Sequence, residues 1–544
     1  MEDFDAEYNL DDFIIKDKEY KRLRRRKIII IVLLILISII VISAVVIVIL
    51  YVKGLNQGEI KCMFITTEAN QELDLINLSE NNKSIIFSLK INEEKFEQKT
   101  SHTFSQKGTH TVKFVFREKL TTLAYLFKDI KNLVEIDLSK LKAEEITSLQ
   151  ETFSECVNLT KVNLNFKKSN KIYNTSFLFY NCFSLQSLEI NFNAQQVTDM
   201  QRMFMNCKSL TNVNLNKLTT NNLKNMSHMF DSCEKLINLD ISSFKLENVE
   251  DMSYTFKSCS NLQDIKFPKS KTNNLLYMNG LFQDLTEIPK LDVDFLRTDK
   301  VTEMVDVFRH CSKVESLDVS HFNTSKVTNM KGIFRFLDSL KSIELYNFDF
   351  RNVVDMEAAF KRCQSLVYIN LSFAQVPNVI GMVETFKECK KLKTLDLPKN
   401  LSNVRYFQGL FHFCYDLEYV DLSPLDGNKN VKTMQFFFAF CYELKNATFP
   451  KIEAKKLTIL QNMFYKCGKV EYIDIGDFVT EDITDMGGMF AYCVNLKFLN
   501  MSKFDTSKVT FYAGIFYKVN TNNLNIVLPE NNDNTQLLRE LGRI

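Results

Sequence analysis

A phenylalanine recurs along this chain of 544 residues with an almost fixed period. Twelve of the fifteen intervals between consecutive copies are 26 residues long. The sixteen copies are Phe127, Phe153, Phe179, Phe204, Phe230, Phe256, Phe282, Phe308, Phe334, Phe360, Phe386, Phe411, Phe438, Phe464, Phe490 and Phe516. This period predicts a solenoid, because one short unit cannot bury its own apolar face and must stack on its neighbours.

Apolar spacing changes along each unit. In one unit the apolar side chains step by three and four residues, as one face of a short helix does. That stripe comprises Val249, Met252, Phe256, Cys259 and Leu262. Elsewhere in the unit, as at Leu239, Asp240 and Ile241, apolar and polar residues alternate with the period of a strand. The sequence therefore predicts an α/β repeat solenoid of about 16 units, each with one short parallel strand and one short helix or helical turn.

The full unit reads Phe-x-x-Cys-x-x-Leu-x-x-Leu-Asp-Leu-Ser-x-Phe-Asp-Thr-Ser-x-Val-Thr-x-Met, with residues 317–334 and 499–516 as the closest matches. At these residues the chain resembles the BspA-type leucine-rich repeats, also called the bacterial surface protein 26-residue repeat. The resemblance covers roughly residues 119–526. Members of this family are surface-exposed proteins of bacteria, mycoplasmas and parasitic or commensal protists. The resemblance therefore implies adhesion or recognition and names no ligand.

An apolar run near the N-terminus predicts one transmembrane helix. Residues 28–52 carry no charge, and a membrane span needs roughly 20 such residues. The run exceeds the length of a signal-peptide core and ends without a small-residue cleavage site, so an uncleaved signal anchor is favoured. Six basic residues precede it, namely Lys21, Arg22, Arg24, Arg25, Arg26 and Lys27. The positive-inside rule then places the N-terminus in the cytoplasm and the repeats outside, as in a type II protein of the plasma membrane.

The predicted domains follow from these signals. Residues 1–27 form a short cytoplasmic tail, whose acidic part before the basic cluster at Lys21 is expected to be disordered. Residues 28–52 are the signal anchor, and residues 53–118, with strand-like runs, form a β-rich juxtamembrane cap that shields the first repeat. Residues 119–526 form the solenoid. Residues 527–544 form a C-terminal cap, with a closing helix expected over residues 536–541.

Twelve of the thirteen cysteines occupy one position of the repeat. Four repeats hold Ile130, Leu285, Leu337 or Val519 there instead. The position therefore requires a modest apolar side chain, and a buried free thiol is favoured over a disulfide, although an extracellular chain makes bridges an alternative. No Cys-x-x-Cys pair is present and the six histidines are scattered, so no metal site is predicted.

The sequence contains no known catalytic constellation. It lacks His-Glu-x-x-His, Gly-x-Ser-x-Gly and a phosphate-binding glycine loop, and the regular array leaves no long loop to build a cleft. The chain is therefore expected to be a binding protein without a cofactor rather than an enzyme. A net charge of +2 gives no indication of nucleic-acid binding.

Two columns of residues are expected to face solvent along the strands. One is largely acidic and includes Asp396, Asp421 and Asp474; these carboxylates either attract basic ligands or cations, or serve the hydrogen bonding between strand and turn. The neighbouring column reads Tyr368, Thr394, Tyr419, Asn446, Tyr472 and Phe498. Exposed aromatic residues bury much area at little entropic cost, so Tyr368, Tyr419, Tyr472 and Phe498 are the candidate ligand contacts, unless they merely pack on one another.

Asn-x-Ser/Thr sequons are frequent in this Asn-rich chain. The candidate glycosylation sites are Asn77, Asn82, Asn174, Asn225 and Asn323.

These observations predict a surface-displayed repeat protein that binds a protein or glycan ligand on another cell or in the matrix, through the strand face of the solenoid. Two alternatives stay open. Solenoids could pack laterally into a coat or a cell-cell contact by self-association, or the chain could be a receptor that lacks its own signalling domain.

Overall fold

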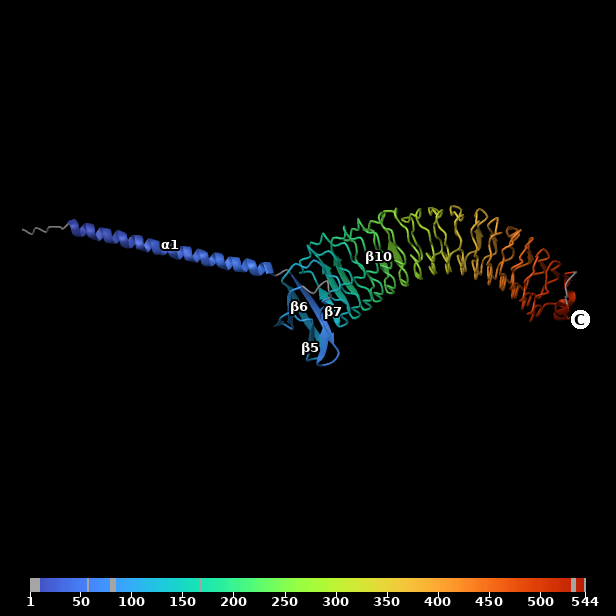
Figure 1. The fold of residues 1–544 in the computed structure, drawn as a ribbon, viewed down its shortest axis with the longest axis horizontal. Coiled ribbons are helices and arrows are strands. Elements are labelled where there is room, and N and C mark those ends of the chain that lie inside the picture. The colour runs from blue at the N-terminus through green and yellow to red at the C-terminus, as the bar shows by residue number, and fades with distance from the viewer. Residues whose placement is uncertain (1–9, 56–57, 79–84, 167, 530–534, 543–544) are drawn as a thin grey trace, which may run out of the picture.

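The computed structural model describes residues 10–55, 58–78, 85–166, 168–529 and 535–542. Figure 1 shows a long helix, a compact β-rich segment and an arc of stacked turns, in chain order. The arc is a solenoid of about 15 turns, which confirms the predicted repeat architecture.

Helix α1, Leu10–Leu55, is 46 residues long. Its segment Ile14–Val48 contains an 18-residue window with a mean hydropathy of 3.6 that packs against no other part of the protein, so the helix is long and apolar enough to cross a membrane. The helix starts well before the predicted boundary at residue 28. The expectation of a disordered acidic tail is therefore wrong for residues 10–20, where the helix extends outward from the apolar run, with an ion pair of 2.6 Å between Lys21 and Asp17.

The segment after the helix forms antiparallel strands, one of which pairs with the first strand of the solenoid. Strands β1 (Glu59–Thr66), β3 (Phe87–Ile91), β4 (Glu94–Phe96) and β6 (Gly108–Phe116) belong to one sheet, and β2 (Gln71–Asp74) pairs with β5 (Ser101–Phe104) in another.

The larger sheet continues directly into the repeats. Its order is β4-β3-β6-β1-β7-β8-β9, and β1 pairs antiparallel with β7 (Leu133–Asp137), the first strand of the solenoid. Strands β8 (Lys161–Asn165) and β9 (Ser187–Asn191) follow in parallel. Strand β1 therefore covers a strand edge that the first repeat would otherwise expose to other chains.

The segment around each anchor phenylalanine is a series of tight turns, so the prediction of one helix per repeat is wrong. In all sixteen repeats the residues two before and two after the phenylalanine have φ of 50–67°. In the repeat of Phe230, the N–H groups of Met229, Asp231 and Cys233 each donate to the carbonyl three residues earlier. The 3-4 spacing of apolar residues fits such consecutive turns as well as a helix, and positive φ excludes the helix.

The remaining N–H groups of this segment donate to the next repeat. Those of His228, Phe230 and Ser232 donate to the carbonyls of Ser253, Thr255 and Lys257 at 2.8–2.9 Å. Backbone groups therefore alternate between a bond within the turn and a bond to the neighbour. An α-helix would have used all of them internally, so this ladder is the gain that offsets the strained φ values.

Short parallel strands occur in most repeats but not in all. After β9 the strands are β10 (Asn238–Asp240), β11 (Asp264–Lys266), β12 (Tyr368–Asn370), β13 (Thr394–Asp396), β14 (Asn446–Thr448), β15 (Tyr472–Asp474), β16 (Phe498–Asn500) and β17 (Asn525–Val527). Between Phe282 and Phe360, where every residue is described, the chain contains no strand. Isolated backbone hydrogen bonds between neighbouring repeats persist there; for example, Lys341 N–H donates to Glu315 O at 3.3 Å.

The anchor phenylalanines form one uninterrupted stack through the solenoid. All fifteen consecutive pairs have ring centroids 5.3–6.1 Å apart and interplanar angles of 3–27°. Phe114 of the N-terminal sheet meets the first ring, Phe127, edge to face at 6.0 Å. The hydrophobic core of the sheet and that of the solenoid are therefore continuous.

The repeated cysteines are buried and free. Each of the twelve thiols donates to the carbonyl oxygen of the preceding repeat's anchor phenylalanine, at 3.0–3.3 Å. Burial raises the pKa of these thiols, to about 12 for Cys389. The cysteine thus adds an inter-repeat hydrogen bond that the apolar residues at the same position cannot make.

The last repeat is covered by β17, which extends the parallel ladder of β16, and by helix α2, Thr535–Glu540. Leu537 and Leu541 are buried against the core. The helix lies where the sequence predicts a closing helix.

We expect the thirteen thiols to be unreactive in the folded protein, because burial removes access and suppresses the thiolate. At pH 8, a maleimide should label no cysteine of the native chain and all thirteen after unfolding in guanidinium without reductant. Fewer than thirteen labelled thiols in the unfolded chain would reveal disulfides and contradict this arrangement.

Candidate interaction surfaces

The acidic column of the strand face performs a structural task in the fold. Carboxylate or amide oxygens of this column accept the backbone N–H two residues later, at 2.9–3.1 Å. Examples are Asp240 to Ser242, Asp421 to Ser423, Asp474 to Gly476 and Asn500 to Ser502. These bonds fix the turn that follows each strand. The same side chains remain exposed or half-buried, so they still border the solvent on the strand face.

Asp396 differs, because Pro398 follows two residues later and offers no N–H. Instead, the hydroxyl of Tyr368, on the preceding rung, donates diagonally to Asp396. This hydrogen bond raises the pKa of Tyr368. The pair couples the aromatic and acidic columns where β12 and β13 lie side by side.

The four candidate aromatic residues do not form one cluster. Tyr472 and Phe498 stack at 4.7 Å with an interplanar angle of 7°, and Tyr472 also donates to Asp474 at 3.1 Å. Tyr419 is 57% exposed and Tyr368 45% exposed, each separated from the next tyrosine by a rung that carries Thr394 or Asn446. The strand face therefore presents three separate aromatic contacts rather than one patch.

The sequon asparagines lie in different environments. Asn174 and Asn225 are half-buried and accept hydrogen bonds from the backbone and hydroxyl of Ser176 and Ser227. Asn323 is exposed, and its amide donates to Asp299 at 2.9 Å. Asn77 is half-buried, and its amide lies 3.5 Å from Lys128 O. Asn82 lies outside the described residues.

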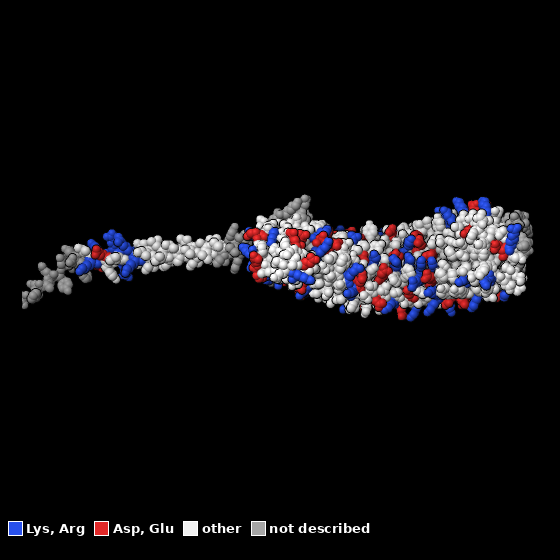
Figure 2. All heavy atoms as spheres, turned by 90° about the horizontal axis from the view of Figure 1, so that it is seen from below, with Lys and Arg blue, Asp and Glu red and all other residues white. Residues whose placement is uncertain are grey.

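Charged residues of the two signs are interleaved over the solenoid (Figure 2). Many pair across one repeat, for example Lys313 with Glu287 at 2.5 Å and Lys497 with Glu471 at 2.9 Å. Each exposed pair contributes little stability on its own. Together they place a cation beside many of the carboxylates along the array. A dense basic cluster in Figure 2 lies on α1, next to its apolar stretch.

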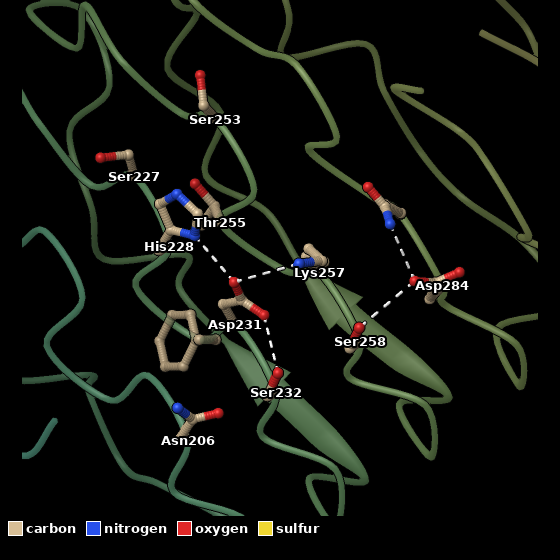
Figure 3. A network of polar contacts seen from close by, with 12 residues as sticks. Asn206, Ser227, His228, Asp231, Ser232, Ser253, Thr255, Lys257, Ser258 and Asp284 are labelled. Atoms are coloured by element: carbon tan, nitrogen blue, oxygen red, sulfur yellow. Dashed lines mark hydrogen bonds and ion pairs between the residues drawn. The ribbon is translucent and has the colours of Figure 1, made fainter. Parts of the chain in front are cut away.

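A buried carboxylate lies among polar groups in the turns around the anchor Phe230 (Figure 3). Asp231 is 1% exposed; it receives His228 Nδ1 at 2.8 Å and the hydroxyl of Ser232 at 2.9 Å, with Lys257 Nζ at 3.9 Å. The Asp stands between the Ser and the His, whereas a hydrolytic triad requires the His between them. The cluster therefore supports the turn and does not activate Ser232. Across the described residues, no group of three or more His, Cys, Asp or Glu side chains is placed to hold a metal ion.

The equivalent turns of the C-terminal repeats carry a second aromatic surface, which the sequence analysis did not predict. In the C-terminal repeats, aromatic or cationic residues occupy the position two residues after each anchor and several of the positions one or four residues after it. We define the tyrosine-lysine wall as Phe440, Tyr442, Tyr465, Lys466, Tyr492, Tyr517 and Lys518. Each of these side chains is half-buried or exposed. Tyr465, Tyr492 and Tyr517 recur at intervals of 27 and 25 residues, and this recurrence is the sequence signal that could have predicted the surface.

Two family models match the chain. The model described as "Mycoplasma protein of unknown function, DUF285" matches residues 93–208, 174–291, 251–371 and 276–399, which together span more than half of the chain. The model of the BspA type leucine rich repeat region, with six copies, matches residues 356–497 and 408–536. The chain belongs to the BspA-type leucine-rich-repeat family. Solenoids of this family are typically interaction scaffolds. The family does not identify the ligand of this BspA-like protein, so the ligand must be inferred from the exposed side chains of its own solenoid.

A solved structure is also similar. A leucine rich cell surface protein from Faecalibacterium prausnitzii is 17% identical, with 71% of this chain and 89% of that chain covered and a TM-score of 0.31. No curated protein matches the chain significantly.

We expect one histidine beside the wall to make stability depend on pH. Burial, and then Lys387 and Lys361, lower the pKa of His412 to about 4, although Glu384 opposes this. The unfolded chain binds a proton near pH 6.5 and the folded chain only near 4, so stability falls as pH decreases through this window, by up to about 1.4 kcal/mol per pH unit. Thermal melts between pH 7 and 4 should show a smaller loss for His412→Gln than for the natural chain. Equal slopes would mean that His412 protonates freely in the fold.

Proposed function

We propose that this BspA-like protein is displayed on the cell surface, where its solenoid mediates adhesion or recognition. One observation carries the proposal: an unpacked apolar helix, Ile14–Val48, is joined to a long solenoid whose exposed side chains repeat along one direction. Such a scaffold binds through many weak contacts in fixed register, and it needs no chemistry at the site.

The proposed topology has the N-terminus in the cytoplasm and the repeats outside the plasma membrane. The basic residues that lie before the apolar stretch of α1 support this orientation. The ligand would be a protein or glycan on another cell or in the matrix. In this topology the sequons at Asn174, Asn225 and Asn323 would be accessible to glycosylation in a eukaryotic host, with Asn323 the most exposed of the three.

The strand face is the first candidate for ligand contact. Tyr368, Tyr419 and Tyr472 offer rings to a partner, and Asp396, Asp421 and Asp474 lie in the adjacent column. A tyrosine beside a carboxylate can bury apolar area while the carboxylate accepts a hydrogen bond or a basic group. Phe498, which is stacked on Tyr472, enlarges the last of these contacts.

Lateral self-association is the second candidate function. Both ends of the arc are covered, by β1 at one end and by β17 with α2 at the other. Association through the sides, rather than the ends, would therefore be the route to a coat or a cell-cell contact. Analytical ultracentrifugation of the full chain in detergent distinguishes the two functions, because only the coat requires specific oligomers.

Replacing Tyr368, Tyr419 and Tyr472 together by Ala should weaken attachment of expressing cells to their substrate, by about ten-fold or more for three lost aromatic contacts. The rings are on the surface, so the melting temperature should change little. Tyr173→Ala, at a site 50% exposed on another column, is the matched control. Unchanged attachment of the triple variant would remove the strand face from the proposal.

Tags at residues 1 and 544 test the proposed topology. On intact cells, an antibody and an added protease should reach only the C-terminal tag, and both tags should become accessible after permeabilisation. If neither tag is reached on intact cells, the repeats face an internal compartment and surface adhesion fails as the function.

A further inference from the structure

The tyrosine-lysine wall lies in the turns that follow the anchors of the C-terminal repeats, on other columns than the strand residues. Its rings form a row that advances by about one ring per repeat. Ring centroids are 5.3 Å apart for Phe440 and Tyr465, 5.4 Å for Tyr465 and Tyr492, and 5.3 Å for Tyr492 and Tyr517. Phe413 extends the row toward the N-terminus, 4.5 Å from Phe440. The row thus spans repeats without interruption, unlike the aromatic residues of the strand face.

Several aromatic residues of this row have a backbone conformation that is energetically unfavourable for bulky side chains. Phe413, Phe440 and Tyr492 have φ of 65°, 64° and 63°, in the left-handed region. The same position holds Asn181 and Asn206 in earlier repeats. Asn tolerates this conformation, whereas a bulky residue adopts it at a cost in free energy. The C-terminal repeats therefore carry large rings two residues after the anchor, at a surface position where stability alone favours Asn or Gly.

The wall combines these rings with cations. Lys466 Nζ lies 5.1 Å from the ring centre of Phe440, 5.5 Å from that of Tyr465 and 5.3 Å from that of Tyr492. Lys518 Nζ lies over Tyr517 at 5.7 Å.

Neither lysine forms an ion pair within the described part of the chain. In the same described residues, the hydroxyls of Tyr442, Tyr465, Tyr492 and Tyr517 have no hydrogen-bond partner. The wall therefore offers flat apolar faces, phenol hydroxyls and positive charge together.

We propose that this wall binds a polysaccharide that carries carboxylate or sulfate groups. Sugar rings present C–H faces that pack on aromatic rings, their hydroxyls pair with phenols, and the acidic groups pair with Lys466 and Lys518. The row of rings along the solenoid suits an extended polymer of repeating units. This inference rests on the proposed surface display and assigns a ligand class to a different face.

The surface fits other polymers less well. Two unpaired lysines are too few for a nucleic acid, whose affinity depends on neutralising many phosphates, whereas a polysaccharide also gains from packing its sugar faces on the rings. A folded protein partner concentrates its contacts on a few aromatic anchors near the centre of its interface. The wall instead presents a continuous row of rings. The hollow that is lined by Asn165 and Asn191 belongs to other repeats, so it offers no pocket beside the wall.

The test uses the full chain in detergent micelles and measures binding to immobilised polymers. Polygalacturonate and heparin are the acidic polysaccharides, dextran is the neutral one, and poly-L-glutamate is an acidic polymer without sugar rings. The natural chain should bind an acidic polysaccharide at least about ten-fold more tightly than either dextran or poly-L-glutamate. Equal binding of dextran, or of poly-L-glutamate, would overturn the proposal, as would no binding of either acidic polysaccharide.

Substitutions locate the binding site. Tyr492→Asn removes a ring from a left-handed position, and Lys466→Asn removes the shared cation from another; each should weaken binding about five-fold or more while the melting temperature is kept. Tyr254→Asn is the matched control, because Tyr254 also has positive φ, at 56°, and also lies under a lysine, Lys257, but outside the wall. Loss of binding in Tyr254→Asn, or full binding in both wall variants, would place the site elsewhere.

The outcome is separable from that of the proposed function. If the chain binds no acidic polysaccharide but cells still attach through the strand face, this inference fails and surface adhesion stands. If the tags place the repeats inside the cell, surface adhesion fails, and binding in micelles still tests the wall by itself.

Discussion

The fold depends on the register between successive repeats. A single column of phenylalanine rings, with centroids 5.3–6.1 Å apart, runs from Phe127 to Phe516, and the backbone N–H groups beside each ring bond to the following repeat. Both interactions require the same offset between neighbours. An insertion must therefore be absorbed between the anchors, as in the 27-residue interval from Phe411 to Phe438, whose rings still stack at 5.4 Å and 12°. The short 3-10 turn Ser423–Leu425 lies in that interval.

This dependence on neighbours explains the two ends. A repeat gains most of its stability from the repeats on either side, so the first and the last would expose core and unpaired strand edges. The N-terminal sheet solves this by placing β1 against β7 and Phe114 against Phe127. At the other end, β17 and α2 cover the last repeat, and Leu537 and Leu541 are buried. Both terminal repeats of the solenoid are thereby covered, and helix α1 precedes it in the chain.

The same constraint separates positions that the fold needs from positions that function can use. Asx residues, buried thiols and anchor rings each make an inter-repeat or turn contact, and the anchor column is phenylalanine in all sixteen repeats. The left-handed positions two residues after the anchors accept many residue types at a moderate cost. Aromatic and cationic residues gather there in the C-terminal repeats, whereas Asn, Ser and Asp occupy them earlier, as at Asn181, Ser232 and Asp284. Variation at these columns can change what the surface binds without disturbing the stack.

The amino-acid sequence by itself determined the solenoid, its anchor column, the long apolar helix and the burial of the cysteines, because each follows from apolar spacing. It predicted a helix around Phe230 and its equivalents, since a helix and consecutive turns share the 3-4 spacing; only the tertiary structure decided for turns, which free half of the N–H groups for the next repeat. The strand columns could be named, but the bond from Tyr368 to Asp396 joins separate rungs. The wall escaped prediction because stacking of repeats, rather than Phe440 or Tyr492 themselves, imposes the positive φ at these positions.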